Sequence, residues 1–259
     1  MSEVAFLTAQ NLNVKLGGRA VLNDISLSLS SGHLVALVGP NGTGKTTLLR
    51  ALAGLLPSDG AIFIGGEALS SLALRDRARR FAYLPQGHVF HWPMSVAAIV
   101  MLGRAPHADT FSSTTPDDRA AVARALAMTE TEAFADRAVT TLSGGERARV
   151  ALARALATQA PVLLADEPTA ALDPRHQLTV MELLRQAARG GGAVLAIMHD
   201  LTLAARFADR VAVMDRGAIV ADGDPSAAMS HDRLAAVFGI ESATVEIDNK
   251  RVPIAGRAI

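Results

Sequence analysis

The stretch Gly39-Pro40-Asn41-Gly42-Thr43-Gly44-Lys45-Thr46 fits the pattern G-x-x-x-x-G-K-[ST]. Its glycines permit a tight curve in which main-chain N–H groups turn inward and form a nest for anionic oxygens. A helix expected over residues 45–55 would point its positive N-terminus at the same oxygens. The apolar run at residues 33–38 suits a buried strand before the loop. This strand–loop–helix context favours a phosphate-binding loop over an ordinary glycine-rich turn.

The side chains of this loop divide the work of holding phosphates and a metal ion. Lys45 supplies a point charge for β and γ phosphates, and the Thr46 hydroxyl is suited to ligate Mg²⁺. The other positions expected to contact the nucleotide are Gly39, Pro40, Asn41, Gly42, Thr43, Gly44 and Thr47.

The bulk composition limits the class of protein. The chain has 259 residues, half of them hydrophobic, which is enough for one large domain or two small ones with a substantial core. The 25 basic and 25 acidic residues cancel, which argues against a nucleic-acid partner. There is no cysteine, so disulfides, thiolate catalysis and cysteine metal sites are excluded.

The hydrophobic runs bear on the location of the protein. The longest, at residues 96–102 and 193–198, fall far short of the roughly 20 residues that a spanning helix needs. Residues 1–10 lack a basic region followed by an apolar one, so no signal peptide is expected. These features predict a soluble cytoplasmic protein whose membrane role, if any, requires a partner.

Strand and helix patterns alternate on both sides of a mostly helical middle. The expected strands are 11–16, 25–29, 33–38, 60–64, 161–165, 193–198, 211–214 and 245–247, and the expected helices are 45–55, 96–102, 146–157, 177–188, 202–208 and 232–238. Thr115 and Pro116 open one more helix as N-cap and first residue. The pattern predicts an α/β fold with a mostly parallel core sheet, an N-terminal antiparallel β-subdomain and an α-helical subdomain inserted at about residues 88–160.

Two carboxylates, Asp166 and Glu167, end the apolar strand expected at residues 161–165. A buried strand that ends in two charges needs partners for them. Asp166 can hold Mg²⁺ through water, and Glu167, which projects differently, can polarise an attacking water. Taken alone, this pair is equally compatible with an ordinary acidic strand end, so the assignment depends on the phosphate loop.

His199 and Gln86 are two further candidates. His199 follows the strand expected at residues 193–198, and ligands of open α/β sheets bind outside the carboxyl ends of the strands. His199 could therefore hydrogen-bond the γ-phosphate, although a lone histidine at a strand end is more often structural. Gln86 lies at the junction into the helical insert and could sense Mg²⁺ or water; without other information it is an ordinary polar loop residue.

A second glycine-rich helix start lies at Leu142-Ser143-Gly144-Gly145-Glu146. Ser143 suits the N-cap, and Gly144 and Gly145 allow an anion to approach exposed N–H groups. The alternative is an ordinary capped helix. A second phosphate-binding helix terminus makes sense if it serves the nucleotide of another subunit.

The ordered set of motifs resembles the ABC ATPase family over nearly the whole chain. It comprises the phosphate loop, Gln86, Leu142-Ser143-Gly144-Gly145-Glu146, Asp166-Glu167, Ala170-Ala171-Leu172-Asp173 and His199. The resemblance implies one P-loop NTPase (RecA-like) domain over residues 1–259, with ATP and Mg²⁺ as cofactors. It also implies a head-to-tail homodimer in which each ATP lies between Lys45 of one subunit and Ser143 of the other.

The resemblance assigns roles to the remaining residues. Glu167 would be the general base, assisted by His199 and Gln86, and Asp173 would communicate across the dimer interface. Thr46 and Gln86 would ligate Mg²⁺ directly, and Asp166 through water.

Narrower features are similar to importers of iron–siderophore complexes, haem or cobalamin. They are Met101-Leu102-Gly103-Arg104-Ala105-Pro106-His107, which follows Tyr83-Leu84-Pro85-Gln86, and residues 234–240. This similarity implies integral membrane permease subunits, a periplasmic or surface binding protein reached indirectly, and a peripheral position on the cytoplasmic face of the inner membrane. Haem or siderophore is the preferred cargo. The alternatives are an exporter ATPase and a soluble ABC ATPase without a transport role.

Three local features carry separate expectations. Leu16 stands where many relatives stack an aromatic ring on adenine, so stacking is in question. Residues 90–94 are either local core or the wall of a groove that grips a permease helix. The spacing of His88, His91 and His107 fits no standard metal site.

Overall fold

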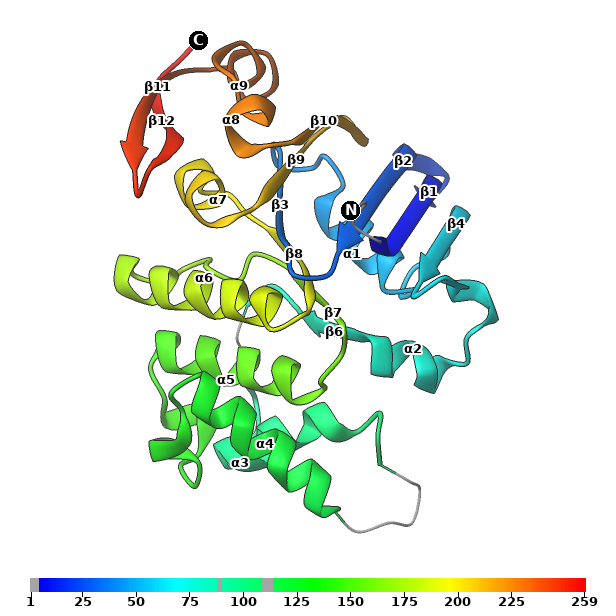
Figure 1. Cartoon of the computed structure of the whole chain (residues 1–259), viewed down its shortest axis with the longest axis vertical. Helices are drawn as coiled ribbons and strands as arrows, with labels where there is room; N and C mark the ends of the chain where they lie inside the picture. Colours follow the sequence, from blue (N-terminus) through cyan, green and yellow to red (C-terminus); the bar gives the residue numbers. More distant parts are fainter. Residues whose placement is uncertain (1–4, 88–89, 109–113) are drawn as a thin grey trace.

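The computed structural model describes residues 5–87, 90–108 and 114–259. Its centre is a six-stranded sheet with the order β10-β9-β3-β8-β7-β6 (Figure 1). The strands are β3 (Leu34–Val38), β6 (Phe81–Leu84), β7 (Val162–Ala165), β8 (Ala193–Ile197), β9 (Arg210–Asp215) and β10 (Ala218–Gly223). All neighbours are parallel except β9 and β10. The predicted mostly parallel α/β sheet is confirmed.

Strand β3 has core on both of its faces. Leu34, Ala36 and Val38 join a cluster that includes α6 (Pro174–Arg189) and α7 (Leu201–Phe207). Val35 and Leu37 join a second cluster that includes α1 (Lys45–Leu52) and the N-terminal sheet. A strand covered on both faces is apolar at every position, and β3, β7 and β8 are buried throughout.

The N-terminal sheet is antiparallel, with the order β2-β1-β4-β5. Its strands are β1 (Ala5–Leu16), β2 (Arg19–Ser30), β4 (Asp59–Ile64) and β5 (Glu67–Ala68). Gly17 and Gly18 have φ values of 57° and 78°, as a two-residue hairpin turn requires. The expected strands 11–16 and 25–29 are therefore parts of longer strands, since the pairing continues from Leu16–Arg19 to Ala5–Ser30.

Three helices follow β6 and precede β7: α3 (Val96–Met101), α4 (Pro116–Met128) and α5 (Gly144–Ala157). They form the lower layer in Figure 1 and have a hydrophobic cluster of their own. Helix α4 begins as predicted, because Thr115 accepts from the Asp118 N–H at 3.1 Å and the Asp118 carboxylate accepts from the Thr115 N–H in return. These helices fall inside the range expected for the insert.

A buried ion pair ties this helical layer together. Arg104 Nε donates to Asp118 Oδ1 at 2.8 Å, and Arg104 Nη1 donates to the Ala157 carbonyl at the end of α5 at 2.9 Å. The bond from Arg104, with those from Thr115, lowers the pKa of Asp118 to about 2. The pair therefore joins the segment after α3 to both α4 and α5.

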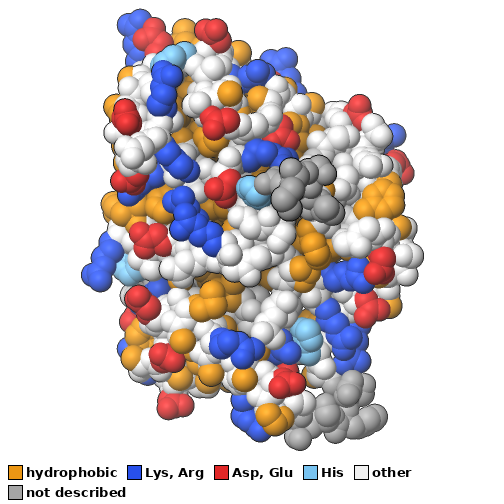
Figure 2. Space-filling model, in the orientation of Figure 1, with side chains coloured by type: hydrophobic (Ala, Val, Ile, Leu, Met, Phe, Trp, Pro, Cys, Tyr) orange, Lys and Arg blue, Asp and Glu red, His pale blue; other side chains and the backbone are white. Residues whose placement is uncertain are grey.

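The remaining elements complete the chain. They are α2 (Leu74–Arg80), α8 (Pro225–Ala228), α9 (His231–Phe238), β11 (Ile240–Ile247) and β12 (Lys250–Ala258). Strands β11 and β12 form a hairpin that packs on α7, where the Thr202 hydroxyl donates to the Pro253 carbonyl at 2.8 Å. Side chains of both charges are interspersed over the face in Figure 2, in keeping with the balanced composition. Among the described residues, no helix combines the length and apolarity needed to cross a membrane.

Candidate nucleotide site

The loop between β3 and α1 is built around two tight contacts. A side chain at Gly39 would collide with the Met214 carbonyl on β9. Gly44 has φ 98°, and a Cβ there would lie 2.8 Å from Leu22 Cδ2. Both positions therefore need glycine, and the loop stays close against the strands. The helix that follows begins at Lys45, as predicted, but ends at Leu52 rather than residue 55, because Gly54 adopts φ 69° and closes it.

Lys45 folds back over this loop. Its ammonium donates to the Gly39 carbonyl at 2.6 Å and to the Pro40 carbonyl at 2.8 Å, and the residue is 6% exposed. Burial lowers the pKa of Lys45, while the nearby charges of Glu167 and Asp166 raise it. The cation is thus held at the nest by neutral carbonyls, which phosphate oxygens can replace as stronger, charged acceptors.

Asp166 lies across from the start of α1. The Thr46 hydroxyl donates to its Oδ1 at 3.1 Å, and the Tyr83 hydroxyl donates to its Oδ2 at 3.2 Å. Burial raises the pKa of Asp166, against the lowering effect of the bond from Thr46. A carboxylate and a hydroxyl side by side are the hard oxygen donors that Mg²⁺ prefers. In the described part of the chain no group of three or more His, Asp and Glu side chains is arranged to hold a metal, so phosphate oxygens and water would have to complete the shell.

Glu167 is held between two donors. Its Oε1 lies 2.6 Å from His199 Nε2, and its Oε2 accepts from Gln86 Nε2 at 2.6 Å. Gln86, Glu167 and His199 follow β6, β7 and β8, which are neighbours in the sheet. The three residues predicted to be catalytic are therefore brought together, and Glu167 has φ 51°, a left-handed conformation that turns its backbone sharply after β7.

The second glycine-rich helix start does not join this group. Ser143 is the N-cap of α5, where its hydroxyl accepts from the Glu146 N–H at 3.3 Å and the Glu146 carboxylate accepts from the Ser143 N–H at 2.7 Å. The latter bond lowers the pKa of Glu146. Ser143 and Gly144 are exposed, and across the described residues no hydrogen bond joins them to the phosphate loop. The predicted capping is confirmed.

Asp173 caps α6, and one histidine connects it to Gly145. Asp173 accepts from the His176 N–H at 3.0 Å and lies 2.7 Å from the ring Nδ1, and these bonds lower the pKa of Asp173. The ring of His176 fills the space where a Cβ of Gly145 would stand. Sequence reasoning missed His176. Its position in the first turn after the cap Asp173-Pro174 is the only signal for it.

The other residues singled out in the sequence lie outside this group. Leu16 is 43% exposed, and Phe90 packs against two core clusters, whereas Trp92 is 75% exposed. His107 Nε2 lies 2.9 Å from the Thr158 carbonyl, and burial lowers its pKa. His88 lies outside the described residues.

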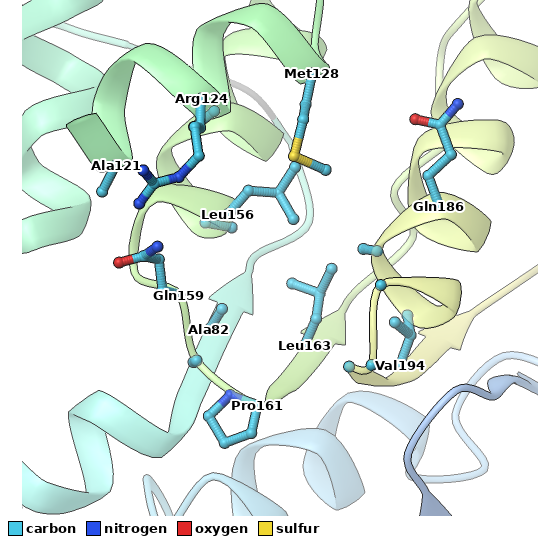
Figure 3. A pocket seen from close by; sticks show the side chains of 17 residues that line it. Ala82, Ala121, Arg124, Met128, Leu156, Gln159, Pro161, Leu163, Gln186 and Val194 are labelled. Carbon is cyan, nitrogen blue, oxygen red and sulfur yellow. The ribbon is translucent and has the colours of Figure 1, made fainter.

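A cavity of about 390 Å³ lies at the amino-terminal ends of the central strands, whereas the phosphate loop follows the carboxyl end of β3 (Figure 3). Leu163 and Val194, each the second residue of its strand, line the cavity from β7 and β8. Met128, Leu156 and Gln186 face them from α4, α5 and α6. None of the residues predicted for nucleotide binding line it, and it lies between α4, α5 and α6 and the first residues of β7 and β8.

The chain is similar in sequence to one protein family and to known relatives. Residues 22–170 match the family described as ABC transporter. The hemin import ATP-binding protein HmuV of Streptomyces coelicolor is 48% identical over 231 residues, which are 89% of this chain and 82% of HmuV.

Two solved structures share the fold. One, from a transporter assigned to the metal-chelate type in an inward-facing conformation, is 25% identical with a TM-score of 0.83, covering 97% of this chain and 96% of that one. The other is the dimeric, post-hydrolysis ATP-binding cassette MJ0796 bound to ADP and Pi. It is 27% identical with a TM-score of 0.72, covering 85% and 98% of the two chains.

Proposed function

We propose a residue-level mechanism on the premise that this chain belongs to the ABC transporter family, as an ATP-hydrolysing import subunit. In this mechanism the phosphates of ATP lie over the loop Gly39 to Thr46 of one copy and are covered by Ser143 of a second copy. Water then attacks the γ-phosphorus and the bond to ADP breaks. The observation that carries the proposal is Glu167, held between His199 and Gln86 beside Asp166 and Thr46.

The first part of the mechanism concerns binding. The main-chain N–H groups of the loop and the α1 N-terminus receive the phosphate oxygens, and Lys45 exchanges its two carbonyl acceptors for them. Thr46 and Asp166 would hold Mg²⁺, and the amide oxygen of Gln86 is a third candidate, since its nitrogen donates to Glu167. When bound, Mg²⁺ neutralises charge on the phosphate oxygens.

The second part concerns hydrolysis. Glu167 accepts a proton from the attacking water, which makes it the general base. His199 and Gln86 fix both carboxylate oxygens at 2.6 Å, so the base is oriented before nucleotide arrives. The strain of φ 51° at Glu167 is consistent with a residue whose orientation matters more than its local stability.

The third part concerns the second copy. The 14-residue helix α5 has a positively polarised start that is exposed at Ser143 and Gly144, and the Glu146 carboxylate of its first turn bonds, among the described residues, to the Ser143 N–H alone. A head-to-tail pair would set this start against the γ-phosphate of the other copy, and Asp173 would lie at the same interface. The dimeric form of the related cassette MJ0796 supports this arrangement.

A mixing experiment tests the shared site. Glu167→Gln is the background, so that bound ATP is retained, and Lys45→Ala and Ser143→Arg are added in separate chains. Neither homodimer has an intact site, but a mixed dimer has one, because Lys45 comes from one chain and Ser143 from the other. We expect the mixture, and neither parent, to retain labelled ATP through gel filtration. Failure of the mixture to retain ATP would contradict sharing.

We propose hemin as the cargo, carried by a separate membrane permease that this subunit contacts from the cytoplasmic face. The 48% identity to HmuV supports hemin, and the 75% exposed Trp92 supports a permease contact, because large exposed aromatics mark interfaces. The permease and subunit should be reconstituted together with binding proteins loaded with hemin, a ferric siderophore or cobalamin. We expect only the hemin-loaded binding protein to stimulate ATP hydrolysis. Stimulation by a binding protein loaded with another compound would contradict hemin as the cargo and assign that compound instead.

A further inference from the structure

A basic cavity lies away from the nucleotide loop, between α6, α7 and the β11–β12 hairpin. Its volume is about 290 Å³, and none of its lining residues belongs to the phosphate loop. Arg185 and Arg189 line it from α6, Arg206 from α7 and Lys250 from β12, against two carboxylates, Glu182 and Asp248. Figure 2 shows basic side chains on this face over the region where Figure 1 draws α6 and α7.

The carboxylates do not satisfy these cations. Asp248 accepts from Arg206 Nε at 2.9 Å, so that pair is neutral as a unit. Among the described residues, Lys250 donates only to the neutral Ala208 carbonyl, at 3.2 Å. Within the same ranges, neither Arg185 nor Arg189 has a hydrogen-bond or ion-pair partner for its side chain. Among the residues that line the cavity, three cations therefore face one remaining carboxylate, that of Glu182, and the Asp209 and Asp224 charges act on Lys250 from outside this lining.

The balance of charges that line the cavity favours an anion. Burial lowers the pKa of Lys250, with further lowering from the Arg185 and Arg189 charges, while Asp209 and Asp224 raise it. The helix dipole accounts for Arg189, since basic groups stabilise the last turn of a helix. It does not account for Arg185, which lines the cavity from the preceding turn and has no hydrogen-bond or ion-pair partner among the described residues.

The backbone holds the two sides of the cavity in place. Asp248 and Asn249 have φ values of 53° and 60°, which form a two-residue turn between Ile247 and Lys250. This turn fixes Lys250 opposite α6, while the Thr202–Pro253 bond fixes β12 to α7. Lys250 and the arginines are therefore presented by elements that are already ordered.

We propose that this cavity binds a small oxyanion of the diphosphate class. Arginine presents a planar fork of donors that matches phosphate oxygens, and two arginines with one lysine supply charge for a multivalent anion. Chloride would satisfy a single donor and leave the cavity largely unfilled. Since Asp173 caps the start of α6 and α7 follows His199, the bound anion joins the hairpin to two helices that start at the candidate nucleotide site.

The test is calorimetric titration of the full chain with inorganic diphosphate at fixed ionic strength. Lys45→Ala is the parent, so that the phosphate loop contributes least. Adding Arg189→Gln should weaken diphosphate binding by about tenfold or more, because a charge-assisted bond is lost. The matched control is Arg257→Gln, an exposed arginine paired with Glu241 on the same hairpin, and it should leave the affinity unchanged.

Two further measurements complete the design. Lys250→Gln should weaken diphosphate binding as Arg189→Gln does, and circular dichroism confirms that each variant is folded. Diphosphate should raise the Tm of the parent and of Arg257→Gln, but not that of Arg189→Gln, since a ligand stabilises only the state that binds it. Equal affinities in all variants, or no saturable binding in the parent, would overturn the proposal.

Discussion

Replacing Glu167 by glutamine keeps the shape of the side chain and removes its charge. In the structure Oε1 faces His199 Nε2 and Oε2 faces Gln86 Nε2, each at 2.6 Å. A glutamine has one oxygen and one NH₂ in those places, so the NH₂ can keep its contact with His199 only if His199 Nε2 becomes an acceptor. The variant therefore loses the proton acceptor and the negative charge that strengthens both contacts.

The magnitude follows from the role of the base. General base catalysis contributes typically 10²–10⁴-fold, which corresponds to about 3–5 kcal/mol of barrier. We expect kcat for ATP hydrolysis to fall by about that factor. ATP affinity should not fall, because Glu167 contributes negative charge near Lys45 and the phosphates, and its removal reduces repulsion. The bound state should therefore accumulate as an ATP-dependent dimer.

Three measurements check this expectation: phosphate release per chain, equilibrium ATP binding, and mass by light scattering with and without Mg-ATP. The matched control is Glu132→Gln, since Glu132 is exposed in the helical layer and its side chain has no hydrogen-bond or ion-pair partner among the described residues. Its kcat should equal that of the unmodified protein. A Glu167→Gln kcat within about tenfold of the parent would refute the assignment of the base.

The other predictions concern binding, pH and packing. Lys45→Ala should abolish measurable ATP binding in fluorescence titration, because the cation at the phosphate nest is lost; unchanged affinity would contradict the loop assignment. Since the pKa of Asp118 is about 2 in the folded protein, below its usual 3.8, the stability contributed by its pair with Arg104 is present above pH 4 and is lost as pH falls from about 4 to 2. Asp118→Asn should unfold at lower temperature at pH 7 and lose less stability over that acid range; an identical pH profile would refute it. Gly145→Ala should lower the Tm by its clash with His176, and His176→Ala should relieve that loss in the double variant. Additive Tm losses would show that the two residues are not in contact.

Much of the fold follows from local signals in the sequence. The phosphate loop, the Thr115 cap and the buried strands at β3, β7 and β8 were all predicted, because each depends on residues close together in the chain. Strand β12 was missed, since Pro253 and Gly256 argue against a strand and are tolerated only because the hairpin has two free edges. Helix α6 was expected at residue 177 and begins at Pro174, where the Asp173 cap is itself a sequence signal.

The site depends more strongly on tertiary structure. That Gln86, Glu167 and His199 meet follows from the order β6-β7-β8, which no local pattern gives, so their grouping rested on the family resemblance. The His176–Gly145 contact joins two helix starts far apart in the chain. The basic cavity likewise combines α6, α7 and a hairpin whose second strand was not predicted.

The void in Figure 3 has a mechanical consequence. The cavity of about 390 Å³ lies where α4 and α5 approach the first residues of β7 and β8, so the helical layer packs on the sheet through α5, whose Ala151 and Leu152 share a core cluster with Leu163. One of the two connections to that layer leaves β6 through Gln86, whose amide nitrogen donates to Glu167. A rearrangement at Glu167 would therefore reach the helical layer through Gln86, and a layer packed on the sheet through one helix would tilt as a unit rather than deform.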